Sequence, residues 1–238
     1  MGWGYYPEYV PVAKKQADAK KALEKLKKKN SDIQPVVIEG NKVAKTWWGI
    51  AWNKNLESYA DYSNRIGRGR AYVRNGMVLD LCIGSEKATA IVAGSGRNPY
   101  KVEVTIEALS KDTWRKITDI CGRSTASIEQ LVQGKFPKEM EYLFTQKGEG
   151  LFPSPKEIKF DCDCPDWADM CKHVAAALYG IGARFDEDPM LFFKLRNIEI
   201  ESLIKKSVEE KMENMLKNSE KKTRRVMTDA NIGELFGI

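Results

Sequence analysis

The chain has 238 residues, of which 42% are hydrophobic and 30% charged, and it carries six tryptophans. This composition is typical of a globular protein and excludes a disordered one. No apolar run approaches the roughly 18–20 residues that a membrane helix needs, and the first residues lack the basic and apolar pattern of a secretory signal. We therefore expect a cytoplasmic protein of one or two domains with no membrane partner.

The net charge of +6 is concentrated near the amino terminus. Residues 14–29 hold eight lysines against Asp18 and Glu24, an excess of six that equals the excess of the whole chain. An apolar stripe at helical spacing predicts an amphipathic helix here. The stripe is formed by Ala19, Ala22, Leu23 and Leu26. The lysines either form a solvated face or contact the phosphate backbone of a nucleic acid. The candidates for that contact are Lys20, Lys21, Lys27 and Lys28.

Tryptophans dominate the next segment. Residues 36–45 are strand-like, and residues 46–58 predict a helix in which Trp48 and Trp52, four residues apart, share one face. Such a cluster serves either as a core anchor or as a platform for stacking bases, and the core is its commoner role.

Residues 68–107 predict a β-meander. Asn75-Gly76 is a strong signal for a two-residue hairpin, and residues 84–86 and 94–99 supply the next two turns. That hairpin would pair Arg74 with Met77, Tyr72 with Leu79 and Arg70 with Leu81, which places arginines beside an apolar row.

Two interpretations of these arginines stay open. They form a basic patch at the rim of the sheet, where Gly67 and Gly69 let the backbone approach a nucleic acid, or they are buried and paired with acids such as Asp61 and Asp80. The candidates for nucleic-acid contact are Arg65, Arg68, Arg70, Arg74 and Arg97.

Residues 112–145 predict helices, with Asp112 capping the first and Ser124 or Thr125 the second. Cys82 and Cys121 have no metal-like neighbours and are interpreted as packing residues. Residues 146–155, rich in glycine and proline, predict a linker.

A Cys-x-Cys pair and a Cys-x-His pair follow. Cys162, Cys164 and Cys171 are three of the five cysteines, and His173 is the only histidine. Three thiolates and one imidazole are a complete tetrahedral ligand set for zinc with no open position. A disulfide would leave one cysteine unpaired, and the interleaved aspartates argue against an apolar cluster.

The sequence around these ligands predicts a strand, a turn and a helix. Residues 157–162 are strand-like, Pro165-Asp166 is a turn, and residues 172–179 have high helix propensity before Gly180-Ile-Gly182. The metal would fasten the turn to the start of the helix. The aspartates at 161, 163, 166 and 169 would repel phosphate, so this turn should face protein.

This arrangement resembles the SWIM zinc finger. Two upstream segments, Val43-Ala-Lys-Thr-Trp-Trp-Gly49 and Arg65-Ile-Gly-Arg-Gly-Arg70, resemble microbial SWIM zinc finger proteins, which are often encoded beside Swi/Snf-class helicases. The resemblance covers about residues 40–185, with an echo at 235–238. It implies a zinc-stabilised module for nucleic-acid or protein contacts, accessory to a helicase.

After this module, Asp188-Pro189 predicts a helix start, and a long amphipathic stripe follows that either packs on the body or meets a partner helix. The stripe comprises Ile200, Leu203, Ile204, Val208, Met212 and Met215. A basic tail closes the chain, formed by Lys221, Lys222, Arg224 and Arg225 ahead of residues 235–238.

We therefore expect an α+β fold in which an antiparallel β-meander with flanking helices precedes a small strand–turn–helix zinc module and a C-terminal helical region. The expected divisions are 1–35, an aromatic arm and basic helix; 36–150, the α+β body; 151–185, the zinc module; and 186–238, helices and the basic tail. With no P-loop and no open metal site, we expect no catalytic activity and no small-molecule substrate. The expected function is a zinc-binding accessory protein that contacts DNA or RNA and a Swi/Snf-class helicase; the alternative is a pure protein-interaction subunit.

Overall fold

The computed structural model describes residues 10–58, 63–96, 98–123, 129–130, 132–133, 135–136, 138–146 and 150–219, with the backbone alone at 63–64, 120–123 and 139. Several predictions lie outside the described residues. These concern the arm at 1–9, Asp61, Arg97, the Cys121 side chain, Ser124, Thr125 and the tail at 220–238. Among the described residues, no helix combines the length and apolar character needed to cross a membrane.

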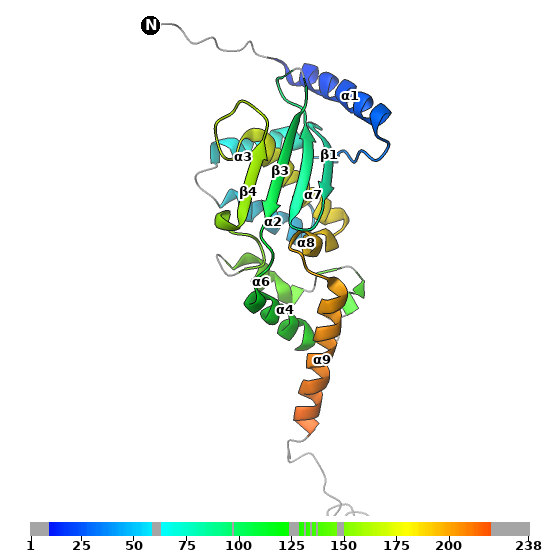
Figure 1. Cartoon of the computed structure of the whole chain (residues 1–238), viewed down its shortest axis with the longest axis vertical. Coiled ribbons are helices and arrows are strands. Elements are labelled where there is room, and N and C mark those ends of the chain that lie inside the picture. The colour runs from blue at the N-terminus through cyan, green and yellow to red at the C-terminus, as the bar shows by residue number, and fades with distance from the viewer. Residues whose placement is uncertain are drawn as a thin grey trace, which may run out of the picture.

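A four-stranded antiparallel sheet of order β1-β2-β3-β4 forms one layer (Figure 1). The strands are β1 (Val78–Ile83), β2 (Lys87–Val92), β3 (Tyr100–Ile106) and β4 (Ile158–Cys162). The meander predicted for residues 68–107 is confirmed over residues 78–106, and β4 adds the strand that leads into the cysteines. The α+β class, the flanking helices and the C-terminal helical region are confirmed as well.

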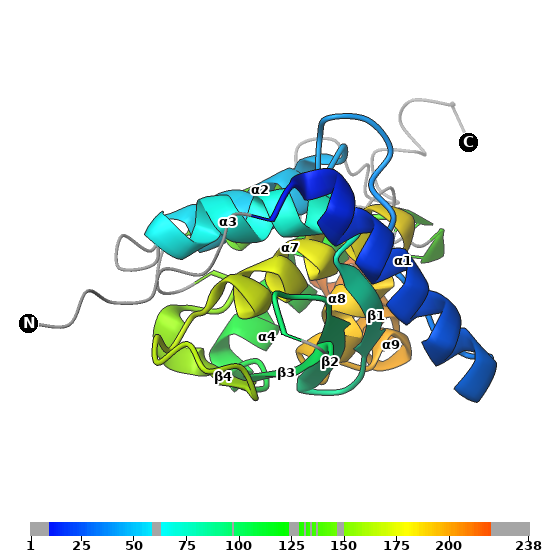
Figure 2. The ribbon, with the colours of Figure 1, turned by 90° about the horizontal axis from the view of Figure 1, so that it is seen from above.

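Helix α7 (Lys172–Glu187) is the central element of the fold. It lies between the sheet and a layer formed by α2 (Trp47–Glu57) and α3 (Ser63–Arg74), as Figure 2 shows. Twelve of its sixteen residues are buried. The predicted helix end at Gly180-Ile-Gly182 is wrong, because α7 continues to Glu187 and these glycines allow other side chains to pack closely against it. A Cβ added at Gly180 would lie 3.1 Å from Leu81, and one added at Gly182 would lie 2.7 Å from Asn53.

Helix α2 anchors the core through its tryptophans. Thr46 caps its start by accepting from the N–H of Gly49 at 3.2 Å. Trp52 is fully buried and donates its indole N–H to the carbonyl of Leu178 in α7 at 2.9 Å. The core role predicted for the tryptophans is therefore confirmed for Trp52.

The hairpin predicted at Asn75-Gly76 is wrong, because the residues before it form α3. Asn75 donates its backbone N–H to Ala71 at 3.1 Å, and Gly76 follows with a φ of 68°. Asparagine at the last turn and glycine with a positive φ also end helices, and Asn75 and Gly76 have these two roles here. The pairing of Arg74, Tyr72 and Arg70 with β1 does not occur, so the arginines stand on a helix and not at a sheet rim.

The strand predicted over residues 36–45 is also wrong. Only the start of that segment runs beside β1, where Val36 donates to Val78 at 3.1 Å and Leu81 donates to Gln34 at 3.0 Å. The predicted basic helix is confirmed as α1 (Val12–Lys29), which buries Ala19 and crosses the end of the sheet (Figure 1).

The C-terminal helical region lies beyond the other end of the sheet. Its helices are α8 (Met190–Leu195) and α9 (Ile200–Ser219), and the earlier helices α4 (Lys111–Arg123) and α6 (Glu141–Thr145) lie at the same end of the sheet (Figure 1). Helices α4 and α9 pack together, and Thr118 donates to Glu210 at 3.1 Å between them. The stripe on α9 packs through Leu203, whereas Met212 and Met215 are exposed.

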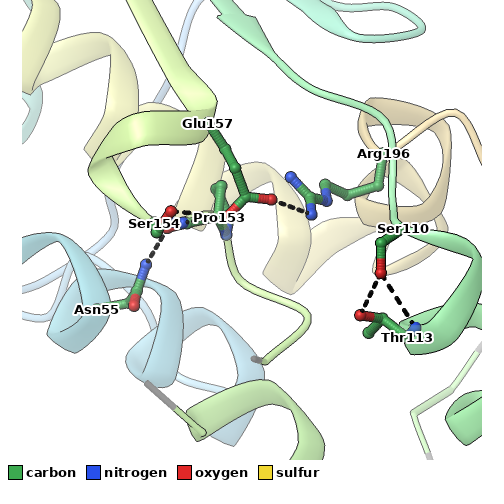
Figure 3. Close-up of polar contacts among 7 residues, drawn as sticks. All are labelled: Asn55, Ser110, Thr113, Pro153, Ser154, Glu157 and Arg196. Atoms are coloured by element: carbon green, nitrogen blue, oxygen red, sulfur yellow. Dashed lines mark hydrogen bonds and ion pairs between the residues drawn. The ribbon is translucent and has the colours of Figure 1, made fainter. Parts of the chain in front are cut away.

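Three smaller predictions are wrong here. Ser110, and not Asp112, caps α4 by accepting from the N–H of Thr113 at 3.2 Å (Figure 3). Residues 151–153 are buried, so the stretch around them is part of the core and no free linker. Cys82 is exposed on β1 and does not pack in the interior.

A buried ion pair joins the sheet to the C-terminal region. Arg196, with 2% of its side chain exposed, donates to Glu157 at 2.7 Å (Figure 3). Glu157 also accepts from the backbone N–H and the hydroxyl of Ser154, each at 2.8 Å. Burial opposes ionisation, but these donors together lower the pKa of Glu157. The pair holds the corner from which β4 runs toward the cysteines.

Candidate metal centre

The four ligand residues come from the end of β4, the turn that follows and the start of α7. Cys162 pairs with Val102 on β3. Asp163 continues this ladder by donating its backbone N–H to the carbonyl of Lys101 at 3.3 Å, and its carboxylate accepts from the N–H of Lys101 at 2.9 Å. Cys171 caps α7, accepting the N–H of Val174 at 3.5 Å.

The four possible ligand atoms of Cys162, Cys164, Cys171 and His173 lie within 4.8 Å of one another. Nδ1 of His173 is 3.8 Å from the sulfur of Cys171 and 4.0 Å from that of Cys162. A tetrahedral zinc site with ordinary bond lengths separates sulfur from nitrogen by about 3.6 Å. These two distances exceed that value by only a few tenths of an ångström, and shifts of up to about 1 Å would bring all four atoms to tetrahedral spacing, so the cluster can hold a metal ion.

The sulfurs do not have equivalent electrostatics. A hydrogen bond from Cys162, with those from His173 and Val174, lowers the pKa of the Cys171 thiol to about 3. The same contact with Cys171 raises the pKa of Cys162, and burial raises the pKa of Cys164. One thiolate at the helix start, beside two thiols, avoids three negative charges in contact. A cation of charge two would favour thiolates at all three positions.

Aromatic packing fixes the imidazole. The His173 ring lies 4.5 Å from the ring of Tyr100 and 5.7 Å from that of Tyr72. Its Nε2 is buried without a hydrogen-bond partner among the described residues. It faces Gly94, where an added Cβ would lie 2.7 Å away. The ring therefore has no room to turn, and Nδ1 is directed at the sulfurs by packing.

The α3 arginines are mostly engaged within the protein. Arg65 pairs with Asp166 of the ligand turn at 3.1 Å. Arg70 pairs with Glu57 and donates to Tyr179 at 3.2 Å. These acids are not the two that the sequence suggested as partners of the arginines. Asp61 lies outside the described residues, and Asp80 accepts from the N–H of Gln34.

The remaining arginines contribute less. Arg74 donates to Asn41 at 3.1 Å, and Arg68 is exposed. Gly69 lies against Ala175 of α7, so its missing side chain serves helix packing and not the approach of a ligand.

The predicted lysines fall on different sides of α1. Lys21 lines a groove between α1 and residues 94–99, whereas Lys20, Lys27 and Lys28 are exposed away from it. Four other lysines line the groove that were not singled out from the sequence. They are Lys14, Lys15, Lys25 and Lys29. The recurrence of lysine at 21, 25 and 29 could have indicated this side of the helix.

Sequence reasoning also missed the exposed Trp167. It lies in the turn between the ligand pairs with 91% of its surface exposed. Asp161, Asp163 and Asp169 around it are exposed as well. An apolar residue inside a metal-binding turn was the available signal.

No protein-family model matches the chain, and no solved structure matches it. Over 163 residues, or 68% of its length, the chain is 36% identical to the uncharacterized protein Rv2102 of Mycobacterium tuberculosis. The match covers 58% of that protein, so the chain spans less than two thirds of its relative.

Proposed function

We propose that the cluster holds Zn²⁺ as a structural ion in a non-catalytic accessory protein. The observation that carries this proposal is the convergence of three sulfurs and one imidazole nitrogen within 4.8 Å. A donor set of this kind is typical of structural zinc, and four protein ligands leave no position for a substrate. The ion would join β4 to α7, the central helix of the fold, so its binding energy would contribute to folding.

Nucleic-acid contact is the second part of the proposal. The lysines of α1 support it, because they give this helix a strong positive charge. The resemblance to SWIM zinc finger proteins supports a Swi/Snf-class helicase as the partner and DNA or RNA as the ligand. The acidic turn argues that the metal centre itself does not grip phosphate.

A pure protein-interaction subunit is the alternative, and one observation favours it. Trp167 is almost fully exposed on a turn that the metal would make rigid, and tryptophan is a frequent anchor of protein interfaces. The pairing of Arg65 and Arg70 with acids also removes two arginines from those that could bind phosphate.

The zinc proposal is tested by elemental analysis of the purified full-length chain and of two cysteine variants. We expect one zinc per chain in the wild type and in Cys82→Ser, which alters a cysteine outside the cluster. Cys164→Ser should lose the ion and unfold at lower denaturant concentration. A wild-type protein without metal, or a Cys164→Ser protein as stable as Cys82→Ser, contradicts the zinc proposal. Catalytic turnover of any substrate by a variant that lacks the zinc ligands contradicts the non-catalytic role.

A further inference from the structure

A groove of about 550 Å³ separates α1 from the loop that joins β2 to β3. Its first wall is one side of α1, from Lys14 to Lys29, and its second wall is formed by Gly94, Ser95, Gly96, Asn98 and Pro99. Fifteen residue steps of helix extend for about 22 Å. About 550 Å³ spread over about 22 Å of length is a mean cross-section of about 25 Å², so the groove is long and narrow.

The helix wall is strongly positive. Five lysines line it, against one acid, Asp18. The lysines are Lys14, Lys15, Lys21, Lys25 and Lys29. None of them forms an ion pair with a described residue, and lysines four residues apart on one helix repel each other. Only Lys29, in the last turn, is favoured by the helix dipole, so the row adds little net stability to α1 and its charge is available to an anionic ligand.

The loop wall is made of small residues and is fastened to the metal centre. Gly94, Ser95 and Gly96 present little side chain to the groove. Behind them, Gly94 packs against His173, and an added Cβ at Gly96 would lie 2.5 Å from the hydroxyl of Tyr100. Polar backbone groups are therefore accessible on a loop that the metal ligands support.

We propose that this groove binds the phosphate backbone of a single-stranded nucleic acid. The inference rests on the proposed nucleic-acid contact and assigns it to one site and one form of ligand. Lysines without acidic partners attract phosphate regardless of sequence, and grooves that bind single strands track the backbone in this way. A duplex, whose major groove alone is about 12 Å wide, is too broad to enter a groove of this cross-section.

The test compares two charge-matched variants of α1 in the full-length, zinc-loaded protein. The groove variant is K21Q/K25Q/K29Q, and the control K20Q/K27Q/K28Q removes the same charge from the same helix outside the groove. Binding to a fluorescent oligothymidylate of about 16 nucleotides, and to the oligouridylate of equal length, is measured by anisotropy across a salt series. Circular dichroism checks that α1 is intact in both variants.

We expect the groove variant to bind at least roughly tenfold more weakly than the control, and the slope of log K against log salt to fall by about 2 for three lost contacts. The matching duplex should bind more weakly than the single strands. Equal losses in the two variants, or preference for the duplex, would overturn the groove while leaving nucleic-acid contact intact. A wild-type protein that binds none of these oligonucleotides would refute the proposed nucleic-acid function itself, and the groove with it.

Discussion

Replacing Gly69 by alanine should loosen the contact between α3 and α7 beside the metal centre. An added Cβ at Gly69 would meet the Cβ of Ala175 and lie 2.7 Å from its carbonyl carbon and 2.8 Å from the nitrogen of Ala176. Carbon atoms pack at about 3.5–4.0 Å, so the helices would have to separate by roughly 1 Å. Backbone atoms cannot rotate away, and overpacking of this kind costs about 1–3 kcal/mol.

Gly67 is a matched control on the same helix. A Cβ there meets nothing within 4 Å. Alanine gains about 1 kcal/mol over glycine in a helix interior, and both variants share this gain. We therefore expect Gly67→Ala to stabilise the protein by up to about 1 kcal/mol and Gly69→Ala to destabilise it by up to about 2 kcal/mol.

Urea unfolding followed by tryptophan fluorescence measures both variants. A titration with a zinc chelator should also show weaker retention of metal in Gly69→Ala, because Ala175 lies only two residues beyond His173 on α7. If Gly69→Ala were as stable as Gly67→Ala and held zinc equally well, the close packing of α3 against α7 would not be what positions the ligands.

Two further predictions concern Glu157 and Gly94. Glu157→Gln leaves the guanidinium of Arg196 buried without its charged partner and should cost about 3 kcal/mol at neutral pH. Because the pKa of Glu157 is lowered in the folded protein, its contribution to the free energy of unfolding is complete above the unfolded pKa of about 4.3 and is lost as the pH falls through the folded pKa. The stability of Glu157→Gln should therefore depend less on pH in that acidic range than the stability of the wild type. A variant with the same pH profile as the wild type would refute this assignment. Gly94→Ala places a Cβ against His173 and should weaken both zinc retention and oligothymidylate binding, whereas Gly84→Ala, in a turn remote from the metal centre, should alter neither.

The metal ligands were identifiable from the sequence because their geometry is local. Cys162 to His173 span twelve residues, and the strand and helix signals on either side determine where each pair begins. The alternation of apolar residues in β3 was similarly informative, since Val102, Val104 and Ile106 are all buried. In both cases the sequence pattern and the tertiary environment favour the same structure.

The errors arose where the deciding contact was distant in sequence. Asn75-Gly76 suits a hairpin and a helix end equally well, and what selects the helix is the packing of Gly69 against Ala175, which no local pattern contains. The same holds for Gly180, which suggests a helix end from the sequence alone but lies inside α7, where its missing side chain makes room for Leu81 of β1. The exposure of Trp167 also depends on distant residues, because it requires that no described residue covers the turn that carries it.

The metal centre lies directly behind the loop that forms one wall of the proposed nucleic-acid groove. His173 contacts Gly94 and Tyr100, at the two ends of the stretch that forms the second wall of the groove, and it lies in the first turn of the most buried helix. A metal ion bound at Nδ1 would hold the ring, and the ring in turn would hold the loop. The acidic turn and the basic groove then have separate roles. In the proposed function, the turn with its exposed Trp167 would contact a protein, and the groove would bind a single strand.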